Sequence, residues 1–151
     1  MTKIIHPIAG AIALLTVLAF WLSTIVSETF GTPAQIVTVK TMIPWGFLVL
    51  IPALIATGGS GFRLGMKFRN DLVSRKRGRM PIIAGNGLLL LIPSALYLSS
   101  KAQAGAFDEA FYAVQVIELI AGAVNITLLG LNMRDGFRLT RKLPPKQFSA
   151  G

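Results

Sequence analysis

Four long apolar segments, almost free of charge, dominate this sequence. Residues 7–26, 41–61 and 81–100 contain no Asp, Glu, Lys or Arg, and residues 110–133 contain only Glu118. A helix needs about 20 apolar residues to cross roughly 30 Å of hydrocarbon, and each segment reaches that length. Charged residues make up only 14% of the chain. The sequence therefore predicts an all-α integral membrane protein, a bundle of four transmembrane helices.

Turn and breaker residues place the boundaries of these helices. Gly31, Thr32 and Pro33 indicate a turn after the first apolar segment, and the run from Thr57 to Gly61 indicates the end of the second. The helices are predicted at residues 5–26, 41–59, 81–99 and 109–133. The connections between them are predicted at residues 27–40, 62–80 and 102–108.

Two short motifs recur at a fixed distance and indicate an internal repeat. Ala9-Gly10 recurs as Ala84-Gly85, and Gly-Phe-Arg-Leu at 61–64 recurs at 136–139, so that both recurrences lie 75 positions apart. Each copy contains two predicted helices, and the chain is therefore predicted to be two tandem helical hairpins. The predicted divisions are a first hairpin at 1–64, a basic loop at 65–79, a second hairpin at 80–139 and a basic tail at 140–151.

The net charge of +9 is concentrated in two parts of the chain, residues 62–80 and the segment after Met133. The positive-inside rule places such segments in the cytoplasm. We therefore expect cytoplasmic N- and C-termini in a bacterial inner membrane, with the basic loop in contact with anionic lipids of the bilayer. The same distribution argues against a nucleic-acid partner, because the basic residues flank membrane spans.

The fourth apolar segment contains a polar stripe. Its members recur at heptad spacing and therefore share one helix face: Gln115, Glu118, Gly122, Asn125 and Asn132. An ionisable residue inside a membrane is a functional hypothesis by default. Lys40 is the predicted partner of Glu118, because it begins the second predicted helix from the same side of the membrane. Glu118 is either a proton carrier, or a ligand for a quinol hydroxyl or a cation, or half of a structural ion pair.

His6 is the only histidine, and it precedes Pro7 as Met80 precedes Pro81. A one-residue gap after Pro7 makes His6 and Met80 equivalent in the two repeats. Histidine and methionine are both axial ligands of haem iron, so these two residues form a candidate haem b site. Three arginines at the same level would bind the haem propionates: Arg63, Arg79 and Arg138. The alternative is an interfacial histidine that binds no ligand.

The sequence contains no cysteine, which excludes thiolate metal sites and cysteine nucleophiles. No other metal site and no catalytic motif is indicated, so an enzyme is not the favoured class. The first functional hypothesis is a non-enzymatic subunit or accessory protein of membrane electron transfer, with haem or quinol as the bound group. The alternative is a small carrier or channel-like protein that uses Glu118.

The layout is similar to that of small bacterial four-helix inner-membrane proteins, some of which bind haem. That similarity is an analogy of fold and implies no function by itself. Four helices enclose little interior volume, so we expect a homodimer or membership of a larger membrane complex.

Overall fold

A computed structural model describes the backbone of residues 2–67 and 71–142 and the side chains of residues 5–60 and 78–138. The α-helices are α1 Thr2–Phe30, α2 Pro33–Lys67, α3 Asp71–Asn86, α4 Ile92–Gln103 and α5 Glu109–Lys142. A π-helical segment, η1 Gly87–Leu91, joins α3 to α4 without a break.

Four stretches of these helices are long and apolar enough to cross a membrane. They are Ile5–Phe30, Pro33–Ser60, Gly78–Gln103 and Glu109–Arg138. The prediction of an all-α protein with four candidate membrane spans is therefore confirmed, and the chain has the architecture of a multi-pass membrane protein.

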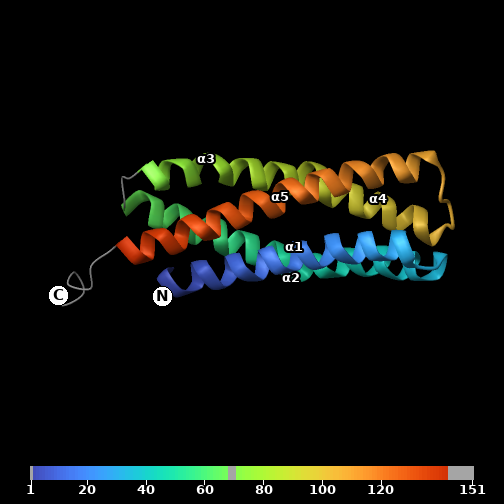
Figure 1. Cartoon of the computed structure of the whole chain (residues 1–151), viewed down its shortest axis with the longest axis horizontal. Coiled ribbons are helices and arrows are strands. Elements are labelled where there is room, and N and C mark those ends of the chain that lie inside the picture. The colour runs from blue at the N-terminus through green and yellow to red at the C-terminus, as the bar shows by residue number, and fades with distance from the viewer. Residues whose placement is uncertain (1, 68–70, 143–151) are drawn as a thin grey trace.

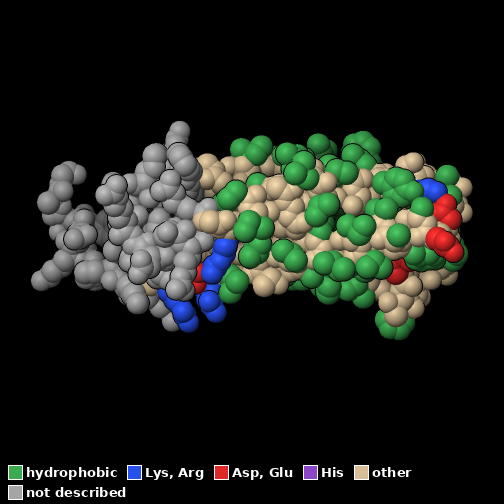
Figure 2. All heavy atoms as spheres, turned by 90° about the horizontal axis from the view of Figure 1, so that it is seen from above, with side chains coloured by type: hydrophobic (Ala, Val, Ile, Leu, Met, Phe, Trp, Pro, Cys, Tyr) green, Lys and Arg blue, Asp and Glu red, His purple; other side chains and the backbone are tan. Residues whose placement is uncertain are grey.

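The surface of the bundle matches this assignment. On the face shown in Figure 2, hydrophobic side chains cover the middle of the molecule, and the charged side chains lie at the two ends of the described region. Large apolar side chains on every span are more than half exposed, for example Leu15, Leu48, Leu89 and Ile120. Exposed apolar faces of this extent are stable in lipid rather than in water.

The spans pack side by side as a four-membered bundle (Figure 1). The first span, α1, packs against α2 and α5, and the rod formed by α3, η1 and α4 also packs against α2 and α5. Within the described helices, α2 and α5 make no direct backbone approach to each other, so they occupy one diagonal of the bundle. Side chains that join α2 to α5 must therefore cross the interior.

The connection between α1 and α2 is much shorter than the predicted 27–40, because only Gly31 and Thr32 separate the two helices. A capping box starts α2: the Thr32 amide donates to Gln35 Oε1 at 2.7 Å, and the Gln35 amide donates to Thr32 Oγ1 at 3.4 Å. Pro33 fits the first helical position, since it has no amide hydrogen to satisfy. Lys40 consequently lies two turns inside α2 rather than at its start.

The second connection on this side, between α4 and α5, agrees more closely with the predicted 102–108. Gly105 has a φ of 65° and closes α4, and its amide donates to the Ala102 carbonyl. Asp108 caps α5 by accepting a hydrogen bond from the Phe111 amide at 2.9 Å. A hydrogen bond from Lys101, together with this amide, holds the pKa of Asp108 below its ordinary range.

At the opposite end the helices extend into the segments that the sequence predicts as a loop and a tail. The loop predicted at 65–79 is helical at 65–67, where α2 ends, and again from Asp71, where α3 begins, while residues 68–70 lie outside the described part. The tail predicted at 140–151 is helical as far as Lys142, and the remainder again lies outside it. Lysine and arginine are good helix formers, so a basic composition does not end a helix.

Candidate functional site

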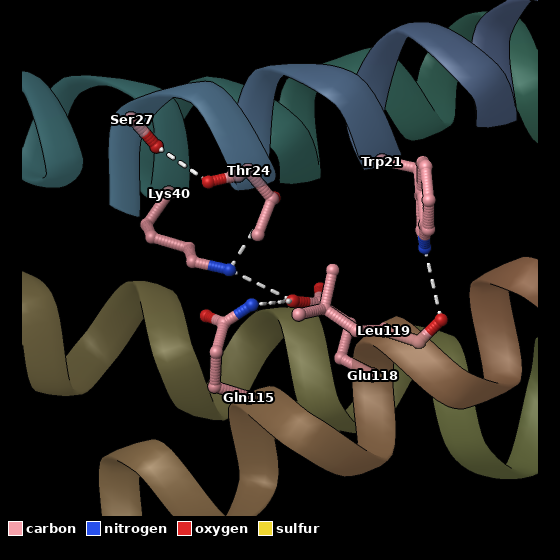
Figure 3. A network of polar contacts seen from close by, with 7 residues as sticks. All are labelled: Trp21, Thr24, Ser27, Lys40, Gln115, Glu118 and Leu119. Atoms are coloured by element: carbon pink, nitrogen blue, oxygen red, sulfur yellow. Dashed lines mark hydrogen bonds and ion pairs between the residues drawn. The ribbon is translucent and has the colours of Figure 1, made fainter. Parts of the chain in front are cut away.

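The centre of the candidate site is an ion pair inside the bundle. The Nζ atom of Lys40 lies 2.8 Å from Oε2 of Glu118, and the two side chains are 0% and 11% exposed. Figure 3 shows the Lys40 chain extending from α2 toward the Glu118 carboxylate on α5. The ion pair predicted from the sequence is present, and it joins the two helices that lie on the bundle diagonal.

Two further side chains complete the contacts of this ion pair. Lys40 Nζ also donates to Oγ1 of Thr24 on α1 at 3.5 Å, and Gln115 Nε2 donates to Glu118 Oε2 at 3.5 Å (Figure 3). Each charge thus has an uncharged hydrogen-bonding neighbour. Fixed partners of this kind are the condition under which a buried ion pair is tolerated.

A third charged residue, Glu28, belongs to the same region of the bundle. It lies one helical turn beyond Thr24 on α1, and its carboxylate interacts electrostatically with both Lys40 and Glu118. The buried oxygen Oε1 of Glu28 has no hydrogen-bond partner, and neither has Oε1 of Gln115. The charged cluster, Glu28, Lys40 and Glu118, therefore contains two carboxylates and one ammonium, with two neighbouring acceptors left unsatisfied.

A cavity of about 40 Å³ adjoins Glu118 at the centre of the bundle. Its wall is mostly apolar, with Phe20, Phe47 and Leu50 among the lining residues and Thr24 and Glu118 as polar members. Trp21 also lines it and donates from Nε1 to the Leu119 carbonyl at 2.9 Å. A water molecule needs roughly 10–15 Å³ of such volume, so the cavity has room for a few waters beside the carboxylate.

Asn125 is not part of this cluster, although the sequence places it on the same helix face. It lies two turns from Glu118, is 2% exposed, and accepts a hydrogen bond from Asn86 Nδ2 at 2.9 Å. Asn86 also donates to the Ala121 carbonyl at 2.8 Å. The burial of Gln115 and Asn125 agrees with the predicted inward orientation of the stripe, but the stripe divides into separate contacts.

The residues predicted to ligate haem lie in the following surroundings. His6 Nδ1 lies 3.0 Å from Ser60 Oγ and 3.1 Å from the Thr57 carbonyl oxygen, both on α2. Met80 packs against the core and accepts a weak hydrogen bond from Asn132 at 3.9 Å. Neither residue lines the cavity beside Glu118 described above. Haem ligation stays a prediction from the sequence.

Two of the three predicted propionate ligands, Arg79 and Arg138, have described side chains. The side chain of Arg63 lies outside the described residues, and Arg138 is exposed at the end of α5. Arg79 instead pairs with the buried Asp135, at 2.8 Å between Nη1 and Oδ2. Among the residues whose side chains are described, no three His, Cys, Asp or Glu gather as a metal site.

Sequence reasoning missed Glu28, Asn86 and the Arg79–Asp135 pair. Glu28 lies in the predicted connection 27–40, and the capping box at Thr32 to Gln35 is the sequence signal that this connection is shorter. Asp135 follows Asn132 by three residues and extends the stripe by about one turn. Asn86 lies in an otherwise apolar span, where a single amide is itself a signal.

No protein-family model, curated protein or solved structure matches this chain. The interpretation of the site therefore depends on its own geometry.

Proposed function

We propose that this chain is a non-enzymatic membrane protein that moves protons through its helix bundle, with Glu118 as the group that binds the proton in transit. The observation that carries the proposal is the Lys40–Glu118 ion pair, which lies on the bundle diagonal and beside an internal cavity. Ionisable residues within membrane spans are expensive, and they mark ion paths and proton relays in many membrane proteins.

The charge balance of the cluster favours a single proton as its ligand. With all three groups ionised, Glu28 and Glu118 carry two negative charges and Lys40 carries one positive charge. A net charge inside a low-dielectric bundle is unfavourable, and binding of one proton removes it. Since no group of three metal-ligating residues occurs among the described side chains, a proton suits the site better than a metal ion.

Polar residues continue along α5 from this cluster toward the opposite end of the bundle. Asn125 with Asn86 lies two turns farther, and Asp135 with Arg79 lies near the end of the span. Between the charged cluster and these contacts lies a short apolar stretch, which includes the cavity beside Glu118. This order of polar groups supports passage along the bundle axis as the role of the site.

A second function is supported by the same ion pair. Because α2 and α5 do not pack directly against each other in the described region, the pair also ties the two hairpins together. A non-catalytic subunit or accessory protein, acting as a homodimer or within a larger complex, would use the pair for rigidity alone. Glu118 would then remain ionised and no proton would move.

We also propose the topology expected from the charges, with cytoplasmic termini in a bacterial inner membrane. It is supported by the position of the start of α1 and the end of α5 at one end of the bundle (Figure 1). Arg134 and Arg138 are exposed at that end and suit anionic lipid head groups. The hairpin connections at Gly31 and Gly105 would face the opposite side.

The proposed tandem duplication is supported by burial. In α2 and α5, buried positions correspond at the predicted offset of 75 residues; the pairs are 36 and 111, 40 and 115, 47 and 122, 50 and 125, 57 and 132, and 60 and 135. In the other pair of spans, the buried Ser99, which follows η1, lies 75 residues after the buried Thr24. The buried Ile83, which precedes η1, lies 74 residues after the buried Ala9. A π-helical turn accommodates one extra residue, which accounts for the change.

The test of proton movement uses the full chain in liposomes of phosphatidylethanolamine and phosphatidylglycerol. An acid pulse is applied outside, and an enclosed pH-sensitive dye reports proton entry. We expect wild-type vesicles to acidify faster than empty vesicles and Glu118→Gln vesicles to behave as empty ones. Glu109→Gln is the matched control, because Glu109 is an exposed carboxylate at the start of the same helix.

Circular dichroism and size-exclusion chromatography establish that each variant is folded. If Glu118→Gln does not fold, Glu118→Asp keeps the charge on a shorter side chain and should slow the flux without abolishing it. Wild-type vesicles that acidify no faster than empty ones would refute proton movement and leave the accessory-subunit function.

A further inference from the structure

We infer that Glu28 is the proton relay between the aqueous phase at the hairpin end of the bundle and Glu118. Water held by Oε1 of Glu28 and Oε1 of Gln115 would connect the two carboxylates. This inference rests on the proposed function, since it assigns the route by which protons reach the Glu118 site.

The position of Glu28 suits a relay. It lies two residues before the end of α1 at Phe30, and therefore close to the hairpin end, whereas Glu118 lies nine residues inside α5. At 1.5 Å per residue, Glu118 is about 14 Å from the start of its helix. Glu28 and Thr24 are four residues apart and share a helix face, and Thr24 contacts Lys40.

Two unsatisfied acceptors indicate where water binds. Gln115 is 4% exposed, and its amide nitrogen is directed to Glu118, yet its oxygen has no partner. Figure 3 shows this oxygen on the side of the amide away from Glu118. The buried Oε1 of Glu28 is likewise without a partner. Buried acceptors of this kind are ordinarily satisfied by ordered water, which would donate a hydrogen bond to each.

The charged groups around Glu28 keep the net charge of the cluster the same before and after the proton passes from Glu28 to Glu118. The charged groups that act on Glu28 electrostatically are Lys40 of α2 and Glu118 of α5, and Lys101 of α4 is paired with Asp108. A proton from the aqueous phase first binds the Glu28 carboxylate. It then passes through water to Glu118, as one O–H bond breaks and another forms. Lys40 stays protonated throughout, and its partner changes from Glu118 to the newly ionised Glu28.

The experiment measures two quantities in the same liposomes. The rate of acidification after an external acid pulse reports proton entry, and the infrared C=O band that is lost in Glu118→Gln reports the proton on Glu118. In Glu28→Gln we expect entry to slow by roughly 100-fold, the lower end of what a positioned proton-transfer group contributes. The Glu118 band should still form after the acid pulse but at a lower pH than in wild type, because Glu28→Gln also removes one negative charge from the cluster.

Rescue by a small weak acid separates a relay from a structural role. Formic acid added outside should restore much of the rate in Glu28→Gln, because it can donate a proton where the side chain is missing. The acidification that permeant formic acid causes in Glu118→Gln vesicles is subtracted, so that only the Glu118-dependent rate is compared. Glu109→Gln should keep the wild-type rate without formic acid. If Glu28→Gln does not fold, Glu28→Asp should give an intermediate rate that formic acid raises.

A wild-type rate in folded Glu28→Gln would overturn the inference, and so would a slowed rate that formic acid does not change. Both results leave Glu118-dependent flux intact. The proposed function fails in a different way, through wild-type vesicles that show neither flux nor a protonated Glu118 band.

Discussion

Lys40 is among the largest fully buried side chains in the described part of the protein, and it is the charged one among them. Its ammonium is stable there because Glu118 and Thr24 replace the water that it loses. The ion pair gains from the low dielectric of the interior, but each ion has also lost its hydration. The protein should therefore lose more stability when one partner is replaced than when both are replaced by apolar residues.

Replacement of Lys40 tests this asymmetry. Lys40→Met leaves the Glu118 carboxylate with Gln115 as its remaining hydrogen-bond donor. We expect the free energy of unfolding to fall by about 3–5 kcal/mol, the usual cost of breaking a buried pair. The double variant Lys40→Met, Glu118→Leu should recover most of this loss. Denaturant titration in detergent micelles measures both; equal stability of Lys40→Met and wild type would show that Glu118 is already neutral.

At the scale of the elements, the turn between α1 and α2 fixes the position of the charged cluster. Gly31 donates its amide hydrogen to the Ser27 carbonyl at 2.9 Å, and a Cβ atom at position 31 would lie 2.4 Å from the same oxygen. The tight turn lets α2 start at Pro33, and this start sets the height of Lys40 opposite Thr24.

Gly31→Ala should therefore destabilise the first hairpin. The clash is with backbone, which cannot move aside as a flexible side chain can, and overpacking of this kind costs about 1–3 kcal/mol. Gly130→Ala is the matched control, because no neighbouring atom lies within 4 Å of the added methyl group and alanine favours the helix. Thermal unfolding should show a lower midpoint for Gly31→Ala alone. A midpoint equal to that of wild type would contradict the tight turn.

The π-helical segment η1 sets the rotation of α4 relative to α3. It precedes Pro93, and it joins α3 and α4 into one rod while changing the phase of the buried face by one residue. Asn86 lies immediately before it and contacts Asn125. Such segments contain one residue more than a regular helix of the same length.

A single deletion inside η1 should accordingly be tolerated. Removal of Leu89, an exposed residue, would convert η1 to regular helix and keep the faces of α3 and α4 in place. Removal of the exposed Leu96, in regular helix, would rotate the rest of α4 by about 100° and misplace Leu98 and Ser99. We expect the first deletion variant to be folded and the second to aggregate in size-exclusion chromatography. The reverse order would refute this account of η1.

At the scale of the whole molecule, two hairpins form a bundle in which α2 and α5 face each other across the interior. The Lys40–Glu118 pair crosses this interior near the hairpin end, and Arg79–Asp135 joins α3 to α5 near the opposite end. Ion pairs thus join different parts of the bundle toward both of its ends, with apolar packing and the small cavity between them.

The proposed orientation in the membrane can be measured without background, because the chain contains no cysteine. We expect a cysteine at Ala104 to react with a membrane-impermeant maleimide in intact spheroplasts. A cysteine at Gly78 should react only after permeabilisation. Both positions are exposed and lie at opposite ends of the span Gly78–Gln103. Labelling of Gly78→Cys in intact cells would invert the proposed topology.

Much of the architecture could be predicted because the constraint is local. A span must be continuously apolar over its own length, so charge-free runs identify the four helices without any knowledge of packing. The inward orientation of Gln115 and Asn125 follows equally from helical spacing. Helix ends were predicted less well: the basic segment continues α2 and begins α3, since charge alone does not end a helix.

The apolar spans and the polar face of α5 follow from the sequence, because both depend on one segment at a time. The partners of the polar groups follow from the tertiary structure. Glu28 acts electrostatically on the Lys40–Glu118 pair, Asn125 binds Asn86, and His6 binds α2, because these contacts depend on the relative heights and rotations of different helices. The two-residue turn and the extra residue in η1 set those heights and rotations.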